Sequence, residues 1–441
     1  MGVAGGAGSV AADGSSAITP LGAGERLRLL FHAGLLLLLL NLAAPNGGLI
    51  GLPVLFFLKN RLHLRAHAFA EFNLLVGIPL YFSFVFGFVR DRWSPFGAGD
   101  RGHLTLFGAA SAAIYAALAF IEPTYGLLLG GLALATIFVL IAASAANGIF
   151  AAMGQDHLMA GQASAVSNIA TFVPTVVGTL VGGALSQRLE TMSAVGAART
   201  LFLVGAGLMV AVAAFGGLGP RALFAARAPA PRDSPIADLA RLARHWPIYP
   251  PFLLLLLWNF APALGTVMGY HLVNSLHASE GQMGAFYAIF WGSAVPTLLL
   301  YGYLCQRVRL GKLLWWGTVI AIPQMLPLLA VHSAVGALIA AVPMGLAGGM
   351  ASGAYIDLAI RSCPKGLQGT TMMLAATTTF FVATRFGDLW GTELYDHAGG
   401  FVAAVIATTA VYALMLPILL LVPRRLVSTA DGEAVEAKAA T

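Results

Sequence analysis

The sequence predicts an all-α membrane protein whose twelve transmembrane helices form two halves of six helices each. The chain has 441 residues, of which 59% are hydrophobic and only 10% are charged, whereas about a quarter of the residues in a soluble domain are charged. Apolar runs long enough to cross a bilayer, which takes roughly 20 helical residues, recur from residue 29 to residue 422. These runs are continuous rather than alternating, which argues against a transmembrane β-barrel.

The expected spans divide equally around the longest polar connection in the chain. The first half is expected to span the membrane at 31–57, 68–89, 104–121, 127–153, 163–186 and 198–218. The second half is expected to span it at 249–274, 282–305, 313–331, 335–360, 371–395 and 401–422. The corresponding domains are a six-helix half at 29–218, a cytoplasmic linker at 219–248 and a six-helix half at 249–422. The ends, 1–28 and 423–441, are rich in small residues, and we expect disordered cytoplasmic tails there.

The distribution of positive charge predicts the orientation of these helices. Most of the 24 Lys and Arg residues fall on the side that carries both termini, and the positive-inside rule makes that side cytoplasmic. We therefore expect a multi-pass protein of the cytoplasmic membrane with both termini inside. The net charge of +6 reflects this asymmetry and contact with anionic lipids rather than nucleic-acid binding. Cys305 and Cys363 are the only cysteines, and their positions predict neither a disulfide nor a metal site.

The two halves weakly repeat each other in sequence. Asn41 in NLAAP corresponds to Asn259 in NFAP, GFVRDR at 87–92 corresponds to GYLCQR at 302–307, and GQAS at 161–164 corresponds to LQGT at 367–370. The three matches occur in the same order and at nearly equal separations. Parallel repeats with a binding site between them near the bilayer midplane are a transporter architecture.

The charged segment between the second and third spans carries a family motif. Gly87, Asp91 and Arg92 in GFVRDR resemble the loop signature G-x-x-x-D-R-x-G of the major facilitator superfamily, and the resemblance covers all twelve helices. It implies that Asp91 lies near the start of helix 11 and Arg92 near a helix-4 carboxylate such as Asp156, bracing the cytoplasmic side in the outward-facing state. It also implies a monomer. The alternative is a solvated, positively charged loop with no gating role.

A narrower resemblance appears in the second half of the chain. Segments 252–276, 286–316 and 356–375 are similar to the folate-biopterin transporter family within that superfamily. The turn R-x-C-P-x-G-x-x-G-T carries the similarity, and it is matched here by Arg361, Cys363, Pro364, Gly366, Gly369 and Thr370. This resemblance implies a folate- or pterin-like substrate.

Polar side chains inside the spans are the candidates for substrate binding, because polar groups are costly in a bilayer and usually face a cavity. Helices 1, 4, 7 and 10 line the cavity in the superfamily. The candidates are Asn41 and Asn46 around an expected helix break at Pro45, Asn147 on helix 4, and Asn259, Tyr270 and His271 on helix 7. The alternative for each asparagine is an interhelical hydrogen bond, and for Tyr270 and His271 it is a place at the far membrane interface.

Charged side chains inside the second half suggest a second group of candidates. Arg385 has Asp388 three residues later on the same helix face. We expect Arg385 to be a basic centre, balanced by Asp388 and reached from helix 2 by Glu71, that holds a substrate carboxylate or closes an outer gate; a purely structural Arg385–Asp388 pair is the alternative. Asp357 is expected to pair with Arg361. Desolvation would raise the pKa of Glu71, Asp357 or Asp388, which makes each a candidate for proton coupling.

Together these observations predict a secondary active transporter that moves a small organic solute by alternating access. An anionic folate- or pterin-like substrate and coupling to protons are expected, and no cofactor is expected. An enzyme is not expected, because no H-E-x-x-H, G-x-S-x-G or Walker-A motif occurs. Transport of another small organic solute, or a non-transporting assembly or receptor role on the same fold, are the alternatives.

Overall fold

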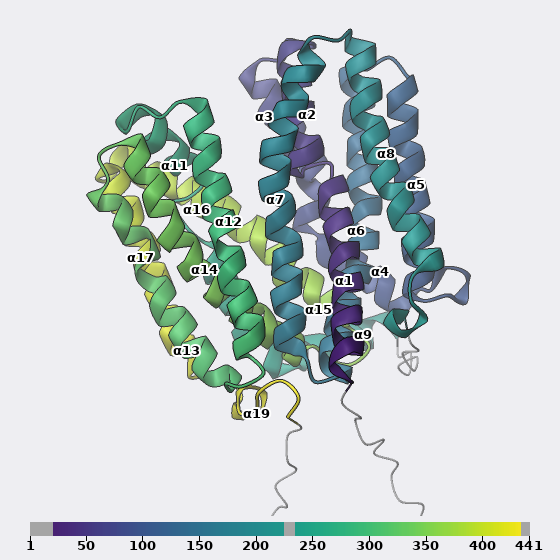
Figure 1. Ribbon diagram of the computed structural model, residues 1–441, viewed down its shortest axis with the longest axis vertical. Coiled ribbons are helices and arrows are strands. Elements are labelled where there is room, and N and C mark those ends of the chain that lie inside the picture. The colour runs from purple at the N-terminus through teal and green to yellow at the C-terminus, as the bar shows by residue number, and fades with distance from the viewer. Residues whose placement is uncertain (1–20, 225–233, 434–441) are drawn as a thin grey trace, which may run out of the picture.

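The computed structural model describes residues 21–224 and 234–433, and these residues fold into two helical bundles that stand side by side (Figure 1). Within these described residues, ten helices are long and apolar enough to cross a membrane, and Leu49–Asn60 is a shorter apolar helix. The other spans are built from shorter helices joined end to end. The expected all-α architecture with two six-helix halves is confirmed.

The first bundle holds the six spans of the N-terminal half. Its helices are α1 (Ala23–Ala43), α2 (Gly48–Asn60), α3 (Ala66–Tyr81), α4 (Ser83–Arg92), α5 (Asp100–Phe120), α6 (Tyr125–Asp156), α7 (Ala160–Glu190) and α8 (Ala194–Leu218). A short 3₁₀ turn, Pro95–Gly97, precedes α5. The helices α1 and α2 form the first span, and α3 and α4 form the second.

The linker and the second bundle complete the chain. The linker contains a 3₁₀ turn (Arg221–Phe224), α9 (Pro235–Arg244) and a second 3₁₀ turn (Trp246–Ile248). The bundle contains α10 (Tyr249–Asn259), α11 (Thr266–Tyr270), α12 (Glu280–Leu304), α13 (Leu310–Ala321), α14 (Ala334–Ser362), α15 (Gln368–Met372), α16 (Thr379–His397), α17 (Gly400–Ala413), α18 (Met415–Leu419) and α19 (Arg424–Val427). Segments His271–Ser275 and Met373–Thr378 are π-helical, and Ile322–Ala330 is a 3₁₀ helix.

The first span is broken between α1 and α2. Proline has no backbone N–H to donate and disfavours helical backbone in the residue before it, and Ala44, which precedes Pro45, is extended. A Cβ atom at Gly47 would lie 2.7 Å from the carbonyl oxygen of Asn41, so the tight turn requires glycine. The break expected from the Pro45 segment is confirmed.

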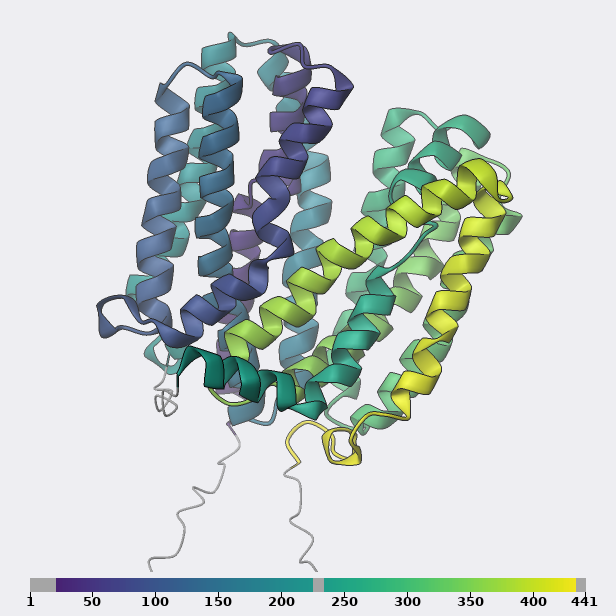
Figure 2. The same ribbon diagram turned by 180° about the vertical axis from the view of Figure 1, so that it is seen from behind.

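The two halves contact each other at one end of the molecule. We call the end that carries α9 and α19 the linker end, and the opposite end the far end. Toward the linker end, the Ser164 hydroxyl on α7 donates to the Gly353 carbonyl on α14 over 2.6 Å. Near the middle of α7 and α12, the rings of Phe172 and Trp291 have centroids 5.0 Å apart. Beyond this level the bundles diverge toward the far end (Figures 1 and 2).

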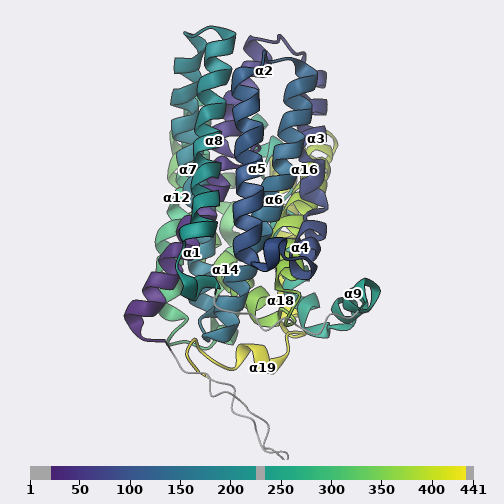
Figure 3. The same ribbon diagram turned by 90° about the vertical axis from the view of Figure 1, so that its right-hand side faces the viewer.

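The ends of the described chain are more ordered than the sequence suggests. Helix α1 begins at Ala23, so residues 23–28 are helical and not part of a disordered tail. Residues 424–433 form α19 and a segment packed under both halves (Figure 3). Residues 1–20 and 434–441, where the rest of the tails is expected, lie outside the described residues.

Candidate functional site

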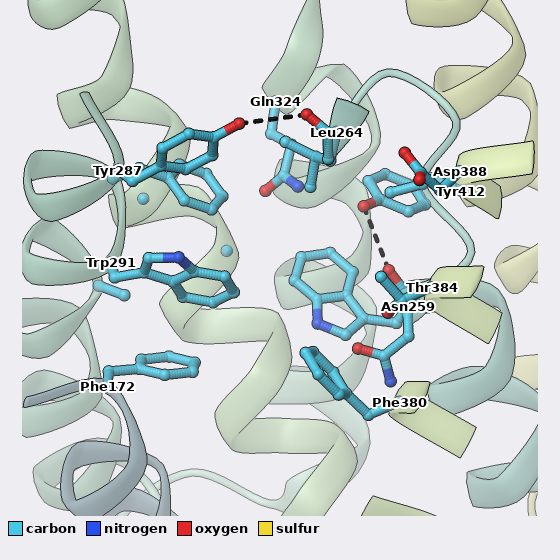
Figure 4. A pocket seen from close by; sticks show the side chains of 17 residues that line it. Phe172, Asn259, Leu264, Tyr287, Trp291, Gln324, Phe380, Thr384, Asp388 and Tyr412 are labelled. Carbon is cyan, nitrogen blue, oxygen red and sulfur yellow. Dashed lines mark hydrogen bonds between the residues drawn. The ribbon is translucent and has the colours of Figure 1, made fainter. Parts of the chain in front are cut away.

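A pocket of about 230 Å³ lies at the level where the two halves begin to diverge. Nearly all of its lining comes from the second half, and Phe172 on α7 is the contribution of the first half. Tyr287 and Trp291 on α12 face Thr384 and Phe380 on α16 across the pocket (Figure 4). The lining is therefore rich in aromatic rings, with a few polar groups among them.

Local sequence features explain why α10 and α16 meet at this pocket. Phe380, Thr384 and Asp388 are spaced four residues apart, which places them on one face of α16 and in the lining. On a neighbouring face of α16, a Cβ atom at Gly391 would overlap the Pro262 carbonyl oxygen. Gly391 therefore allows α16 to approach the backbone that follows α10.

The chain between α10 and α11 is shaped by Gly265. This residue has φ 64°, a left-handed conformation that favours glycine. The turn brings the Thr266 backbone N–H and hydroxyl within 2.8 Å of the two Asp388 carboxylate oxygens. Asp388 thereby holds the first residue of α11 beside the pocket.

Asp388 and Arg385 do not form the pair expected from their spacing. Asp388 lines the pocket and accepts its hydrogen bonds from Thr266. Arg385 is exposed outside the lining, and within the described ranges neither its side chain nor that of Glu71 has an ion pair or hydrogen bond. The structure therefore brings Asp388 to the pocket and leaves Arg385 and Glu71 apart from it.

Asparagines expected to bind substrate have different positions. Asn41 donates to the Ala170 carbonyl over 3.0 Å and joins α1 to α7. Asn147 donates to the Ala143 carbonyl over 3.0 Å within α6. Asn46 is exposed in the helix break. Asn259 donates to the Leu255 carbonyl over 2.8 Å and lines the pocket, so it is the asparagine that could contact a ligand there.

Tyr270 and His271 lie outside the pocket lining. Tyr270 is 57% exposed. The His271 ring stacks on Phe401 with centroids 3.6 Å apart. Both residues lie close to the far end of the seventh span, as in the alternative that places them at the membrane interface.

Asp91 joins the two halves at the linker end. Its carboxylate accepts hydrogen bonds from the Gly369 N–H at 3.1 Å, the Thr370 N–H at 2.7 Å and the Thr370 hydroxyl at 2.8 Å. A Cβ atom at Gly87 would lie 2.6 Å from the Gly369 carbonyl oxygen, so glycine allows the close approach of α4 and α15. Asp91 therefore lies at the start of the eleventh span, which begins with α15, as the family resemblance implies.

The partner of Arg92 differs from expectation. Arg92 forms its ion pair with Asp238 in the first turn of α9, because α9 crosses the linker end beside α4. Asp156 is exposed, and among the described residues it forms no ion pair with Arg92. Gln155 makes the polar bridge from α6 instead, donating to the Ile360 and Cys363 carbonyls over 3.0 and 2.7 Å.

Arg90 is a linker-end residue that sequence reasoning missed. It is buried and pairs with Asp91 at 2.7 Å and with Asp100 at 2.5 Å. A Cβ atom at Gly148 would overlap the guanidinium group. The second Asp-Arg pair at 100–101 was a signal that this loop contains its own counter-charges.

The expected pair of Asp357 with Arg361 is present at 2.7 Å. Asp357 is fully buried and also accepts a hydrogen bond from the Tyr301 hydroxyl at 2.7 Å. Arg361 has a second partner, Asp431, at 2.9 Å. Burial and the nearby charge of Asp357 raise the pKa of the Asp431 carboxyl to about 6, while Arg361 opposes the rise.

Most of the pocket residues were not singled out from the sequence. Gln324 is the only polar side chain between residues 319 and 331, and prolines flank it at 323 and 327, which is a usable signal for a functional group in a span. Trp258 directly precedes Asn259. The aromatic residues of α12 gave no signal distinct from ordinary packing.

A sequence profile described as Major Facilitator Superfamily matches residues 52–387. The chain belongs to this superfamily. Membership makes it a membrane transporter by family rather than an enzyme, and agrees with the resemblance seen at Gly87, Asp91 and Arg92. No curated protein sequence matches the chain.

Solved structures of the Major Facilitator Superfamily share the fold of this member. The transporter FucP in the outward conformation has a TM-score of 0.67 and 17% identity, covering 89% of this chain and 98% of its own. The proton:xylose symporter XylE bound to 6-bromo-6-deoxy-D-glucose has a TM-score of 0.66 and 13% identity, covering 91% and 97%. The human organic anion transporter MFSD10 has a TM-score of 0.57 and 17% identity, covering 90% and 100%.

Proposed function

We propose that this protein is a secondary active transporter that binds a small organic solute in the pocket beside Trp258 and Asp388 and moves it by alternating access. The observation that carries the proposal is the position of the pocket. It lies where the two halves diverge, and the contacts of Asp91 and Gln155 close the linker end beneath it. Such a site is accessible from one side at a time, as alternating access requires.

We place the linker end on the cytoplasmic side of the cytoplasmic membrane, with both termini inside. The excess of Lys and Arg in the loops at this end supports that orientation. The conformation is then outward-facing. The hydrogen bonds of Asp91 to the start of the eleventh span, at α15, hold the cytoplasmic side closed. Glu71 and Arg385 are candidates for an outer gate that forms when the far end closes.

Coupling to protons is proposed through Asp388, because it is the titratable carboxylate among the pocket-lining residues. FucP is a fucose:proton symporter and XylE a proton:xylose symporter, as their structures are described. These proteins share the fold, and their coupling ion is a reasonable first choice for this chain.

The first test is uptake of labelled biopterin and folate into proteoliposomes, with and without an inward proton gradient. We expect gradient-driven uptake of biopterin, which is the neutral pteridine of the two, and an uptake rate about tenfold lower in Asp388→Asn, the change that corresponds to about 1.4 kcal/mol. Arg385→Ala tests the separate proposal of an anion site, which requires that the variant lose folate uptake. Unchanged transport in Asp388→Asn would contradict coupling through this residue.

Absence of pteridine uptake from correctly folded protein would remove the pteridine and leave the transporter open to other solutes. Absence of flux of every solute tested, together with measured binding, would favour the receptor alternative. Biopterin is the more informative probe, because a pocket of about 230 Å³ is smaller than the roughly 300–1,000 Å³ that holds drug-sized ligands.

A further inference from the structure

The walls of the pocket favour a flat, mostly apolar ligand. Phe172, Phe290 and Trp291 form one aromatic cluster, with centroids 5.0 Å apart for both the Phe172–Trp291 and the Phe290–Trp291 pairs. Trp258 and Tyr412 form another, stacked at 5.1 Å. Aromatic faces bind flat rings by stacking and attract cations electrostatically.

Two side-chain amides of the pocket, those of Gln324 and Asn259, offer oxygens as hydrogen-bond acceptors. Gln324 is 4% exposed, and its side-chain Oε1 atom has no hydrogen-bond partner in the described structure. A buried acceptor without a partner costs about 1–3 kcal/mol. The Asn259 amide uses its N–H on the Leu255 carbonyl, which leaves its oxygen as an acceptor. A ligand that donates N–H or O–H groups would satisfy both oxygens.

The charge of the pocket excludes a good site for an anion. Asp388 is the charged residue in the lining, and no Lys, Arg or His from the described ranges joins it there. Tyr287, which also lines the pocket, already donates its hydroxyl to the Gly265 carbonyl over 3.2 Å. A carboxylate ligand would meet Asp388 without a compensating positive charge, which is costly in a low-dielectric site.

We propose that the pocket takes a small, mostly apolar ring molecule that is neutral or singly positive and that donates a hydrogen bond to Gln324. This inference rests on the proposed function, because it names the class of solute for the same pocket. Gln324 sets the specificity for a donor group, and Asp388 sets the preference against anions. The aromatic walls supply most of the contact area.

Calorimetric titration of the purified full chain tests the inference by binding alone, independently of transport. Three probes share a phenyl ring of similar size: phenethylamine is a cation, 2-phenylethanol is neutral and 3-phenylpropionate is an anion. We expect the cation and the alcohol to bind at least tenfold more tightly than the anion. Gln324→Leu should weaken them about fivefold or more, and Gln306→Leu, an exposed glutamine at the end of α12, should not.

Tighter binding of 3-phenylpropionate, or full affinity in Gln324→Leu, would overturn the inference. Failure of all three probes in a preparation with a normal thermal unfolding transition would also count against it. Binding in the expected order without flux of any probe would instead contradict the transporter function and leave the ligand class standing.

A separate observation concerns the segment at 428–433, which we call the strap. On the side of the first half, its Asp431 carboxylate accepts from the Gly161 and Gln162 N–H groups at 3.1 and 3.0 Å. The Gly432 N–H donates to the Leu158 carbonyl over 2.7 Å. These atoms surround the start of α7, where backbone N–H groups are otherwise unpaired.

The strap is equally attached to the second half. Arg361 pairs with Asp431 at 2.9 Å and donates to the Thr429 carbonyl over 3.1 Å. The Asp431 N–H donates to the Cys305 carbonyl over 2.9 Å. Asp431 is only 7% exposed. One side chain from the end of the chain thus links α7 of the first half to α14 of the second.

We infer that the strap is a latch that holds the linker end closed and must release α7 before that end can open. The Asp431 contacts to Gly161 and Gln162 cross between the halves, so rocking of the halves breaks them. The contacts to Arg361 and Cys305 stay within the second half and keep the strap in place for reclosure.

Distances between spin labels across the linker end test the latch. Labels are placed at Ala98→Cys and Lys365→Cys, which are exposed positions on the two halves, while the natural Cys305 and Cys363 are buried. We expect Asp431→Asn to raise the ratio of the open population, which has the longer distance, to the closed population about tenfold. A chain ending at Val427 should do the same, and Asp396→Asn, an exposed acid at the end of α16, should not. Distance distributions unchanged from the parent in both strap variants would overturn the inference.

Discussion

Asp91→Asn is expected to shift the molecule strongly toward a form that is open at the linker end. The Asp91 carboxylate accepts three hydrogen bonds from Gly369 and Thr370 and pairs with Arg90. An amide would point an N–H group at these donors and leave Arg90 with Asp100 alone. The three hydrogen bonds to the charged carboxylate cross between the halves, and a hydrogen bond to a charged group contributes about 1.5–3 kcal/mol, so we expect a change of about 100-fold or more in the ratio of the two states.

The same spin-label pair at positions 98 and 365 measures this ratio for Asp91→Asn. Uptake of a transported solute should fall in parallel, while expression and membrane insertion stay at parent levels. Glu122→Gln, which alters an exposed acid in the turn after α5, is the matched control. An unchanged distance distribution in Asp91→Asn would show that the contact of Asp91 with α15 has no gating role.

Arg361→Met is expected to lower stability more than any surface substitution. It removes the positive charge between Asp357 and Asp431 at the linker end, where Asp357 is fully buried and also bonded to Tyr301. Two carboxylates would then be buried without a counter-charge, which costs about 3–5 kcal/mol for one broken pair. We therefore expect a clear fall in the temperature of unfolding in detergent.

Lys365→Met provides the control, because Lys365 is an exposed basic residue in the turn that follows the same helix. Adding Asp431→Asn to Arg361→Met should recover part of the loss, since one of the uncompensated charges is then gone. Equal unfolding temperatures for Arg361→Met and Lys365→Met would contradict a structural role for the Asp357–Arg361–Asp431 cluster.

The features that sequence reasoning predicted well are local or carried by a motif. The spans follow from continuous apolar runs, the break in the first span follows from Pro45, and the Asp357–Arg361 pair follows from a four-residue spacing on one helix. The placement of Asp91 at the start of the eleventh span, at α15, followed from a family resemblance.

Predictions failed where the partner of a side chain comes from another helix and depends on how the helices pack. Arg92 meets Asp238 because α9 crosses beside α4, and no spacing in the sequence reveals that crossing. Asp388 binds Thr266 rather than Arg385, because the glycine turn at 265 brings the α11 backbone closer to it. The roles of Asn41, Asn46, Asn147 and His271 in substrate binding stay predictions.

By itself, the sequence determined the membrane environment, the twelve spans, the division into halves and the superfamily, because hydrophobic length and local motifs encode these properties directly. Tertiary structure alone decided which aromatic residues surround the pocket, that Gln324 and Asp388 face it, and that Asp431 crosses from the chain end to α7. Helical periodicity orders residues on the faces of one helix. Which faces meet depends on helix packing and on glycine contacts such as those at Gly87 and Gly391, which only the folded molecule reveals.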